Sequence, residues 1–315
     1  MNVVGLGGGI GASRLRAALA RAVDPSRLTL IVNTADDLWV HGLRVCPDLD
    51  TTLYALSGRQ DLERGWGLRG ESWRCMNALR SLGRDVWFSL GDTDLATHLL
   101  RTGLLREGVG LVEVTAHLAR ALNVRGRVLP MTEDEVATWI EPVSGQRMHY
   151  EEFLVLHQAV PPIQRVTYEG IESATPAPGV LEALYDADLV IIAPSNPVAS
   201  IIPILSLAGL RGAIRTDAAI VGVAPIVSRI PIKNAGERRR AASRAALLKA
   251  IGVSPTATGV AELYKGLIAR YVIDSADACE SEAITSLGIH PIPVPTLLHL
   301  GAKPDPLMDA VLGIR

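Results

Sequence analysis

Short apolar runs recur along this 315-residue chain, and their spacing limits the folds that it can adopt. Glycine, proline or polar residues bound each run, as expected for strands that are buried on both faces. Segments of helical character separate several of the runs, which predicts an α/β fold with a doubly wound, mainly parallel sheet. The predicted strands are Val3-Val4, Leu28 to Val32, Val86 to Phe88, Leu189 to Ala193, Ala219 to Val223 and Tyr271 to Ile273. The predicted helices include Ala12 to Val23, Asp94 to Leu105, Thr115 to Leu122, Glu237 to Ile251 and Glu280 to Leu287.

One interval interrupts this alternation. Residues from about 131 to 178 are richer in proline, glutamate and scattered aromatics, and they lack a clean period. We therefore expect a single α/β domain over residues 1–315, with about 131–178 forming a smaller cap or edge extension within it.

Charge and cysteine content narrow the partners and the compartment. A formal net charge of −2 lacks the electrostatic footprint of a protein that binds nucleic acid or an anionic membrane. Cys46, Cys75 and Cys279 lie far apart, which argues against a disulfide framework or paired zinc ligands. The first residues show no signal-peptide pattern. We expect a cytoplasmic protein that acts on small molecules.

The uncharged stretch from Leu189 to Leu210 is long enough to cross a bilayer. It contains Pro194, Pro197 and Pro203, and this clustering of helix breakers favours a buried strand, a turn and a short helix. We expect no membrane span.

A glycine-rich loop follows Val3-Val4 and opens a predicted helix. Backbone amides and the helix dipole at such a position can receive phosphate, so Gly7, Gly8, Gly9 and Gly11 are predicted to bind a phosphorylated donor. Arg14, in the first helical turn, would add a charge-assisted contact. A tight turn without a ligand is the structural alternative.

The same glycines also fit the dinucleotide fingerprint, so an NAD(P)-dependent oxidoreductase remains an alternative. That class expects an acidic residue at the end of the second strand. This chain has Asn33-Thr34 there, and both are predicted to contact the donor.

Four aspartates follow the second predicted strand, at the edge where open α/β sheets bind ligands. Asp48 and Asp50 would point to the same side of an extended segment. These aspartates could instead serve in turns and caps, with Asp50 as N-cap of a helix from Thr51 to Leu56. The density of acids favours magnesium or activation of a hydroxyl, so Asp37, Asp48 and Asp50 are the predicted Mg2+ ligands.

Two further polar loops are predicted to share this edge. Ser89 to Asp94 follows one predicted strand, and Ala193 to Pro197, containing Ser195 and Asn196, follows another. The run Gly236 to Arg240 is interpreted as a solvated first turn of a helix rather than a phosphate contact. Trp66 and Trp73 are interpreted as ordinary partly buried residues rather than a stacking platform.

Taken together and in order, these motifs closely resemble the 2-phospho-L-lactate transferase family of coenzyme F-420 biosynthesis. The matching segments are Gly7 to Leu15, Asn33 to Trp39, Pro47 to Thr51, Leu90 to His98, Pro194 to Pro197, Ala224 to Val227 and Gly259 to Tyr264. The resemblance implies a Rossmann-like core, a homodimer and dependence on Mg2+. It also implies a guanosine diphosphate ester of lactate, enolpyruvate or a related acid as donor, 7,8-didemethyl-8-hydroxy-5-deazariboflavin as acceptor, and release of GMP.

The resemblance also assigns site residues. Asp50 becomes the catalytic residue, and the deazaflavin contacts fall on Asp50, Ser89 and Asp92; members of the family often have a basic side chain at the position of Ser89. The predicted donor contacts are the loop glycines, Arg14, Asn33, Thr34, Ser195 and Asn196. A non-catalytic nucleotide sensor is a further alternative, but grouped carboxylates would repel a bound anion unless a metal offsets them.

Overall fold

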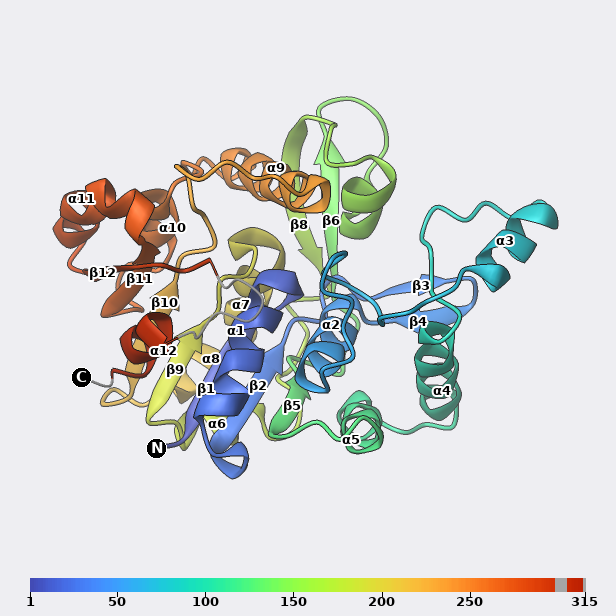
Figure 1. Ribbon diagram of the computed structural model, residues 1–315, viewed down its shortest axis with the longest axis horizontal. Coiled ribbons are helices and arrows are strands. Elements are labelled where there is room, and N and C mark those ends of the chain that lie inside the picture. The colour runs from blue at the N-terminus through green and yellow to red at the C-terminus, as the bar shows by residue number, and fades with distance from the viewer. Residues whose placement is uncertain (298–304, 314–315) are drawn as a thin grey trace.

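The core of the computed structural model, which describes residues 1–297 and 305–313, is a seven-stranded parallel sheet (Figure 1). Its strand order is β12-β11-β10-β9-β1-β2-β5. The bounds are β1 (Val3–Gly7), β2 (Leu28–Val32), β5 (Arg127–Pro130), β9 (Leu189–Ile192), β10 (Ala219–Val223), β11 (Arg270–Asp274) and β12 (His290–Val294). The chain builds the sheet outward in one direction from β1 and then, through β9, in the other. The order therefore reverses between β1 and β9, the switch point at which open α/β sheets bind ligands.

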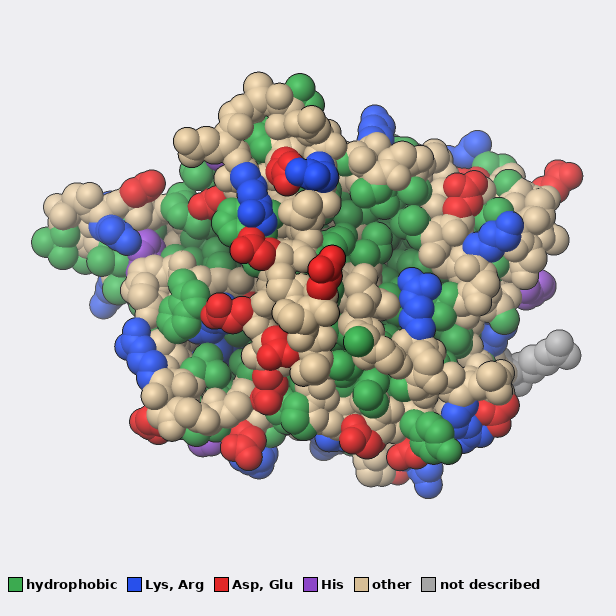
Figure 2. All heavy atoms as spheres, turned by 180° about the vertical axis from the view of Figure 1, so that it is seen from behind, with side chains coloured by type: hydrophobic (Ala, Val, Ile, Leu, Met, Phe, Trp, Pro, Cys, Tyr) green, Lys and Arg blue, Asp and Glu red, His purple; other side chains and the backbone are tan. Residues whose placement is uncertain are grey.

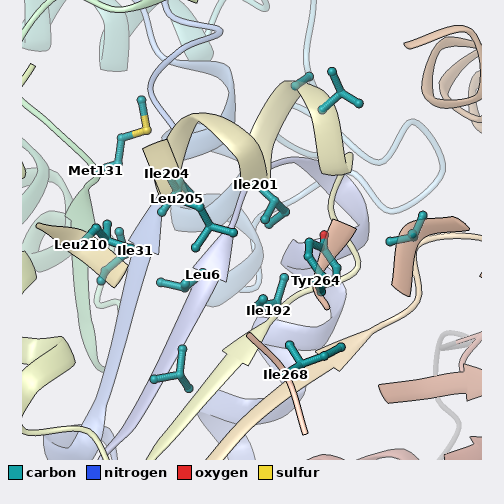
Figure 3. Packing of buried hydrophobic residues seen from close by; sticks show 14 of the residues in the cluster. Leu6, Ile31, Met131, Ile192, Ile201, Ile204, Leu205, Leu210, Tyr264 and Ile268 are labelled. Carbon is teal, nitrogen blue, oxygen red and sulfur yellow. The ribbon is translucent and has the colours of Figure 1, made fainter. Parts of the chain in front are cut away.

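The central strands bury both of their faces, which explains why they are apolar without alternation. Val3 and Leu189 pack beneath α1 (Gly9–Ala22) and α12 (Asp305–Leu312), whereas their neighbours Val4 and Val190 belong to the core on the opposite side. Figure 3 shows that second core, where Leu6, Ile31 and Ile192 of the sheet lie near residues of the covering helices such as Ile204 and Tyr264. Two separate cores on one sheet define the doubly wound arrangement and confirm the predicted fold class.

The helices on the second face and at the β12 edge come mostly from the C-terminal half. They are α6 (Val180–Tyr185), η3 (Pro197–Ile201), α7 (Ile202–Ser206), α8 (Leu210–Ala213), α9 (Ala235–Ala250), α10 (Ala257–Leu263), η4 (Ser275–Glu280) and α11 (Ser281–Ser286). Within the described part of the chain no helix is long and apolar enough to span a bilayer, and Leu189 to Leu210 is divided among β9, η3 and α7.

An arm at the β5 edge carries several polar loops of the site (right side of Figure 1). It comprises the hairpin of β3 (Leu38–Val40) and β4 (Leu43–Val45) together with α3 (Arg74–Ser81) and α4 (Asp94–Arg106). Helices α2 (Pro47–Leu56) and α5 (Leu111–Ala121) lie between the arm and the sheet. The short turn η1 (Pro25–Arg27) precedes β2. A small separate core packs it together, in which Leu38, Met76 and Leu90 are buried.

The interval that lacks a clean period forms a three-stranded antiparallel sheet in the order β7-β6-β8. Its elements are β6 (Ala137–Pro142), β7 (Met148–His149), η2 (Glu152–Leu156) and β8 (Ile163–Glu169). This sheet lies within the interval predicted as a cap or edge extension, and α9 packs against β8 (Figure 1).

Two local predictions are wrong, and two strands were not predicted. Val86 to Phe88 is not a strand but part of the irregular connection between α3 and α4, and it is apolar because it packs into the core of the arm. The helix predicted from Thr51 begins at Pro47, so Asp50 lies in its first turn and is not an N-cap. The edge strands β5 and β12 were not predicted, because proline or arginine interrupts their apolar pattern.

Candidate active site

A cavity of about 630 Å³ lies beyond the carboxyl ends of β1, β2 and β9. Eight of the predicted site residues line it: Gly8, Gly9, Gly11, Asp48, Asp50, Ser89, Ser195 and Asn196. Gly7, Arg14, Asn33, Thr34, Asp37 and Asp92 are not part of its lining. The switch point of the sheet thus holds a ligand-sized cavity, and the loops after β1, β2 and β9 meet there as predicted. On the face in Figure 2, acidic and basic side chains are interspersed rather than gathered by sign.

The glycines of the loop are required by close contacts within the protein. A Cβ on Gly7 would lie 2.3 Å from the Ser195 hydroxyl oxygen, and one on Gly11 would lie 2.3 Å from the Pro194 carbonyl oxygen. The Gly8 amide donates a 3.0 Å hydrogen bond to Ser195. The loops after β1 and β9 therefore interlock at the switch point, and no larger residue fits between them.

Asp48 occupies the N-terminal end of α1. A Cβ on Gly8 would lie 1.7 Å from Asp48 Oδ2, and the Gly9 amide hydrogen-bonds to the same carboxylate. The Asn33 side-chain amide donates to Asp48 at 3.0 Å, and the buried Arg16, whose pKa burial lowers to about 10, lies beneath. A protein carboxylate thus already satisfies part of the positive helix end at which the sequence predicted phosphate. The phosphate contact of this loop stays a prediction.

Buried carboxylates gather at this end of the cavity. Burial raises the pKa of Glu151 to about 8, with Asp48 and Asp37 adding to the effect. Burial together with Asp48 and Glu151 also raises the pKa of Asp36, and its Oδ1 has no hydrogen-bond partner among the described residues. Asn33 donates to both Asp36 and Asp48, each at 3.0 Å, and holds the two side by side.

The predicted metal ligands are not together. Asp37 lies 3.6 Å from Arg44, away from the cavity lining, and burial raises its pKa to about 7. Asp48 and Asp50 both line the cavity, but two residues apart in a helix they point about 160° apart and meet different partners. The described residues contain no group of three or more His, Cys, Asp or Glu able to hold a metal. A metal here would need oxygens from a bound ligand as well.

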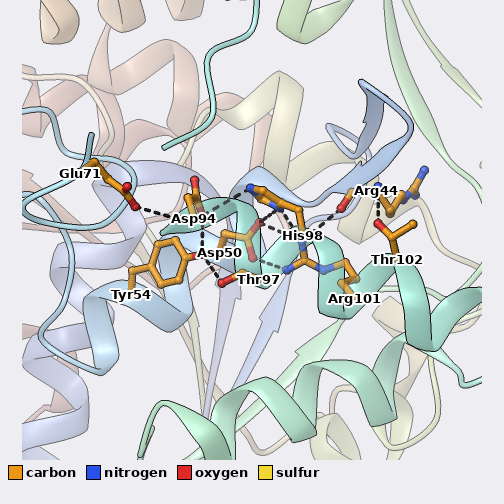
Figure 4. A network of polar contacts seen from close by, with 9 residues as sticks. All are labelled: Arg44, Asp50, Tyr54, Glu71, Asp94, Thr97, His98, Arg101 and Thr102. Atoms are coloured by element: carbon orange, nitrogen blue, oxygen red, sulfur yellow. Dashed lines mark hydrogen bonds and ion pairs between the residues drawn. The ribbon is translucent and has the colours of Figure 1, made fainter. Parts of the chain in front are cut away.

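Asp50 belongs to a buried network between α2 and α4 (Figure 4). Arg101 grips its carboxylate with both terminal nitrogens, one of them 3.1 Å from Oδ2. Burial alone would lower the pKa of Arg101, but Asp50 holds it above its ordinary value. Such a bidentate pair fixes the orientation of the carboxylate that faces the cavity.

His98 extends this network. Arg101 can only donate, so Nδ1 of His98, 3.2 Å away, accepts from it, and Nε2 of His98 lies 3.4 Å from Asp94 Oδ1. The Tyr54 hydroxyl also hydrogen-bonds to Asp94, and Glu71 accepts from the amides of Thr93 and Asp94 at 2.8 Å. Asp94, His98 and Arg101 thus form one chain that ends on Asp50 (Figure 4).

The predicted deazaflavin contacts differ in their position. Ser89 lines the cavity and accepts a 3.2 Å hydrogen bond from Arg80. Asp92 is engaged elsewhere, because its carboxylate accepts from the amides of Arg74 and Cys75 and so caps α3. A contact between Asp92 and a deazaflavin stays a prediction.

Aromatic side chains form part of the wall. Trp66, Trp87 and Phe88 line the cavity, and Trp66 is 38% exposed. Trp66 is thus partly buried, as interpreted, and whether it stacks on a ligand stays a prediction. Arg64 lies over Trp66 and Trp73, 5.4 Å from each ring centroid, so this part of the wall combines flat apolar surface with positive charge.

Several lining residues were not predicted. Arg239, Arg240 and Arg244 of α9 line the cavity. The run Gly236 to Arg240 lies in the first turn of this helix, as interpreted, and a phosphate contact by it stays untested. The spacing of Gly236, Arg240 and Arg244, four residues apart on one helix face, could have indicated a shared direction. Glu151 had no local signal, since it enters the site only through the fold of the antiparallel extension.

Comparison with known proteins adds the family. Residues 3–285 match the model of 2-phospho-L-lactate transferase CofD. The chain is 38% identical over 305 residues to a phosphoenolpyruvate transferase of Mycolicibacterium smegmatis, covering 90% of this chain and 91% of that one. It is 33% identical over 305 residues to a 2-phospho-L-lactate transferase of Methanosarcina mazei, covering 97% of each. A UPF0052-family crystal structure from Bacillus halodurans shares the fold, with a TM-score of 0.65, 19% identity, and coverage of 99% of this chain and 98% of that one.

Proposed function

This chain belongs to the 2-phospho-L-lactate transferase CofD family, transferases of coenzyme F-420 biosynthesis, and from that premise we propose its reaction. It moves a phospholactyl or phosphoenolpyruvyl group from a guanosine diphosphate ester to the terminal ribityl hydroxyl of 7,8-didemethyl-8-hydroxy-5-deazariboflavin, and GMP leaves. The observation that carries the proposal is the cavity at the switch point, which presents a fixed carboxylate, an aromatic wall and a group of arginines.

The two sides of the cavity suit two different substrates. Asp50, Ser89 and Trp87 lie on the side of α2 and the arm, where a flat ring with a polyol chain would find stacking surface and hydrogen-bond acceptors. The glycine loop, Ser195 and α9 lie on the side of the sheet edge, which suits the charged donor. The transferred phosphorus would then lie between the two sides.

Magnesium suits the acidic end of the cavity. Asn33 holds Asp36 and Asp48 side by side. The Oδ1 atom of Asp36 has no hydrogen-bond partner among the described residues, so this hard oxygen ligand is free to bind a metal ion. One or two carboxylates together with substrate phosphates are the usual ligands of Mg2+ in proteins. We propose Asp48 and Asp36 as its protein ligands, in place of Asp37, which Arg44 engages. When bound, the ion would neutralise charge on the diphosphate.

Bond making and breaking in this reaction require little covalent work from the protein. The ribityl hydroxyl oxygen bonds to the phosphorus that carries the acid, and the bond from that phosphorus to the bridging oxygen breaks, so that GMP leaves with that oxygen. Asp50 accepts the hydrogen bond of the attacking hydroxyl and receives its proton as the new bond forms. Because Arg101 fixes both oxygens of Asp50, the hydroxyl is oriented before the reaction starts.

The test is mass spectrometry of reactions that contain the deazariboflavin, Mg2+ and a lactyl or enolpyruvyl guanylyl donor, with and without the protein. We expect a deazaflavin product that has gained the phospho-acyl mass, with GMP released in equal amount, and the preferred donor identifies the acid. Absence of product with every donor from folded protein would overturn the proposal. Binding of NAD(P) rather than a guanine nucleotide would then support the oxidoreductase alternative.

We also propose that the protein is a homodimer, as the family resemblance implies. Light scattering of the purified protein tests this directly, since a dimer has twice the mass of the 33.6 kDa chain.

A further inference from the structure

Helix α9 presents a row of positively charged side chains to the cavity. Gly236, Arg240 and Arg244 lie four residues apart on one face of the helix, and Ala235 and Arg239 lie on the adjacent stripe. All five line the cavity. Arg238, on the other side, bonds to backbone carbonyls of the preceding loop instead.

Two of these arginines have no ion-pair partner among the described residues. Among the described residues, the ion pairs made by α9 join Glu237 to Arg14 at 3.3 Å and to Arg240 at 3.0 Å. Arg239 and Arg244 take part in none of them. Like charges four residues apart destabilise a helix, and burial lowers the pKa of Arg244. An anion in the cavity would offset both effects.

The position of α9 is fixed on three sides. The Arg14–Glu237 pair joins it to α1, and the Asn234 side chain donates to the Glu63 carbonyl at 3.5 Å. Further along, the hydroxyls of Ser243 and Tyr150 lie 3.3 Å apart, and Asn196 donates to Tyr150 at 3.4 Å. The arginines are therefore held above the loops after β1 and β9, on the donor side of the cavity.

We propose that Arg239, Arg240 and Arg244, with the first amides of α9, form the binding site for the diphosphate of the guanylyl donor. This inference rests on the proposed function. Planar guanidinium groups suit paired phosphate oxygens, and the N-terminal end of a sixteen-residue helix favours negative charge. Because charge develops on the bridging oxygen as GMP leaves, the same arginines would also stabilise the departing group.

Calorimetric binding of GDP and guanosine to the full chain tests the site without catalysis. We expect wild-type protein to bind GDP much more tightly than guanosine. The variant Arg239→Gln/Arg244→Gln should lose about ten- to a hundred-fold in GDP affinity while its affinity for guanosine stays within about twofold. Lys249→Gln, which removes one exposed positive charge from the last turn of the same helix, is the matched control and should bind GDP normally.

The outcomes separate this inference from the proposed function. If the wild type catalyses the transfer but the double variant binds GDP as well as the wild type does, the arginine site is wrong and the function stands. Equal losses for GDP and guanosine would also overturn the site, because they would indicate general damage rather than a lost phosphate contact. If the wild type neither binds GDP nor forms product, the proposed function is wrong, and the arginine site that rests on it is wrong as well. Loss confined to GDP, with circular dichroism unchanged, supports the site.

Discussion

Replacing Asp50 by asparagine separates the role of this residue in stability from its role in turnover. Arg101 is 1% exposed, and Asp50 is the carboxylate that it grips. Removing one partner of a buried pair leaves an uncompensated charge and costs about 3–5 kcal/mol. Asparagine keeps one acceptor oxygen, so we expect the lower end, about 3 kcal/mol. Against a total stability of roughly 5–15 kcal/mol, Asp50→Asn should still fold.

The turnover of Asp50→Asn should fall much further than its stability suggests. Loss of a positioned proton acceptor lowers rates by about 10²–10⁴, and an amide cannot take the proton of the ribityl hydroxyl. Urea denaturation followed by tryptophan fluorescence gives the stability at pH 7, and GMP release gives the turnover.

A second change, Arg101→Met, completes a double-mutant cycle. With the buried charge removed as well, Asp50→Asn/Arg101→Met should regain stability to within about 1 kcal/mol of the wild type, because uncharged groups of similar size often replace a buried pair at little cost. Its turnover should stay low. If the two single losses simply add in the double variant, the reasoning about a mutually dependent pair is wrong. Unchanged turnover in Asp50→Asn would remove Asp50 from the mechanism.

Three further predictions follow from the same geometry. Burial raises the pKa of Glu151 from 4.5 to about 8, so its contribution to folding stability is fully present below pH 4.5 and is lost as pH rises to about 8. That contribution is worth up to roughly 5 kcal/mol at 1.4 kcal/mol per pKa unit. Glu151→Gln should flatten this decline of stability in melting curves without Mg2+, and an unaltered pH profile would contradict the prediction. Gly8→Ala should destabilise by about 1–3 kcal/mol or more, since its Cβ meets Asp48, whereas Gly103→Ala, in open space on α4, should gain up to about 1 kcal/mol; equal urea midpoints would refute the contact. Trp66→Ala should weaken deazaflavin binding about three- to tenfold in a fluorescence titration, and unchanged affinity would place the ring elsewhere.

The residues that position Asp50 show that a sequence motif can indicate a family before the roles of its residues are known. The segment from Leu90 to His98 was informative as a family motif. Its histidine lines the cavity, but it also contacts other residues of the site. His98 positions Arg101, and Arg101 positions Asp50, through hydrogen bonds that join α4 to α2. Only the approach of the two helices gives the motif this role.

Local patterns were sufficient for the five inner strands of the sheet and for the edge at which the site lies. Apolar runs that pack on both faces and turn residues at strand ends act over a few positions, so β2 and β10 were predicted with their observed bounds. The loops after β1, β2 and β9 then had to meet, because carboxyl ends of parallel strands share one edge. Family motifs in those loops identified the family in the same way.

Tertiary structure alone decided which charged groups face one another. Asp48 turns to the N-terminus of α1, Asp37 to Arg44, and Asp50 to Arg101, although all three aspartates belong to one short stretch of sequence. Glu151 and Arg244 enter the cavity from elements about a hundred and about two hundred residues further along the chain. A carboxylate or guanidinium group can pair with any opposite charge that comes within a few ångströms, and that distance is set by the packing of the whole fold rather than by neighbours in sequence.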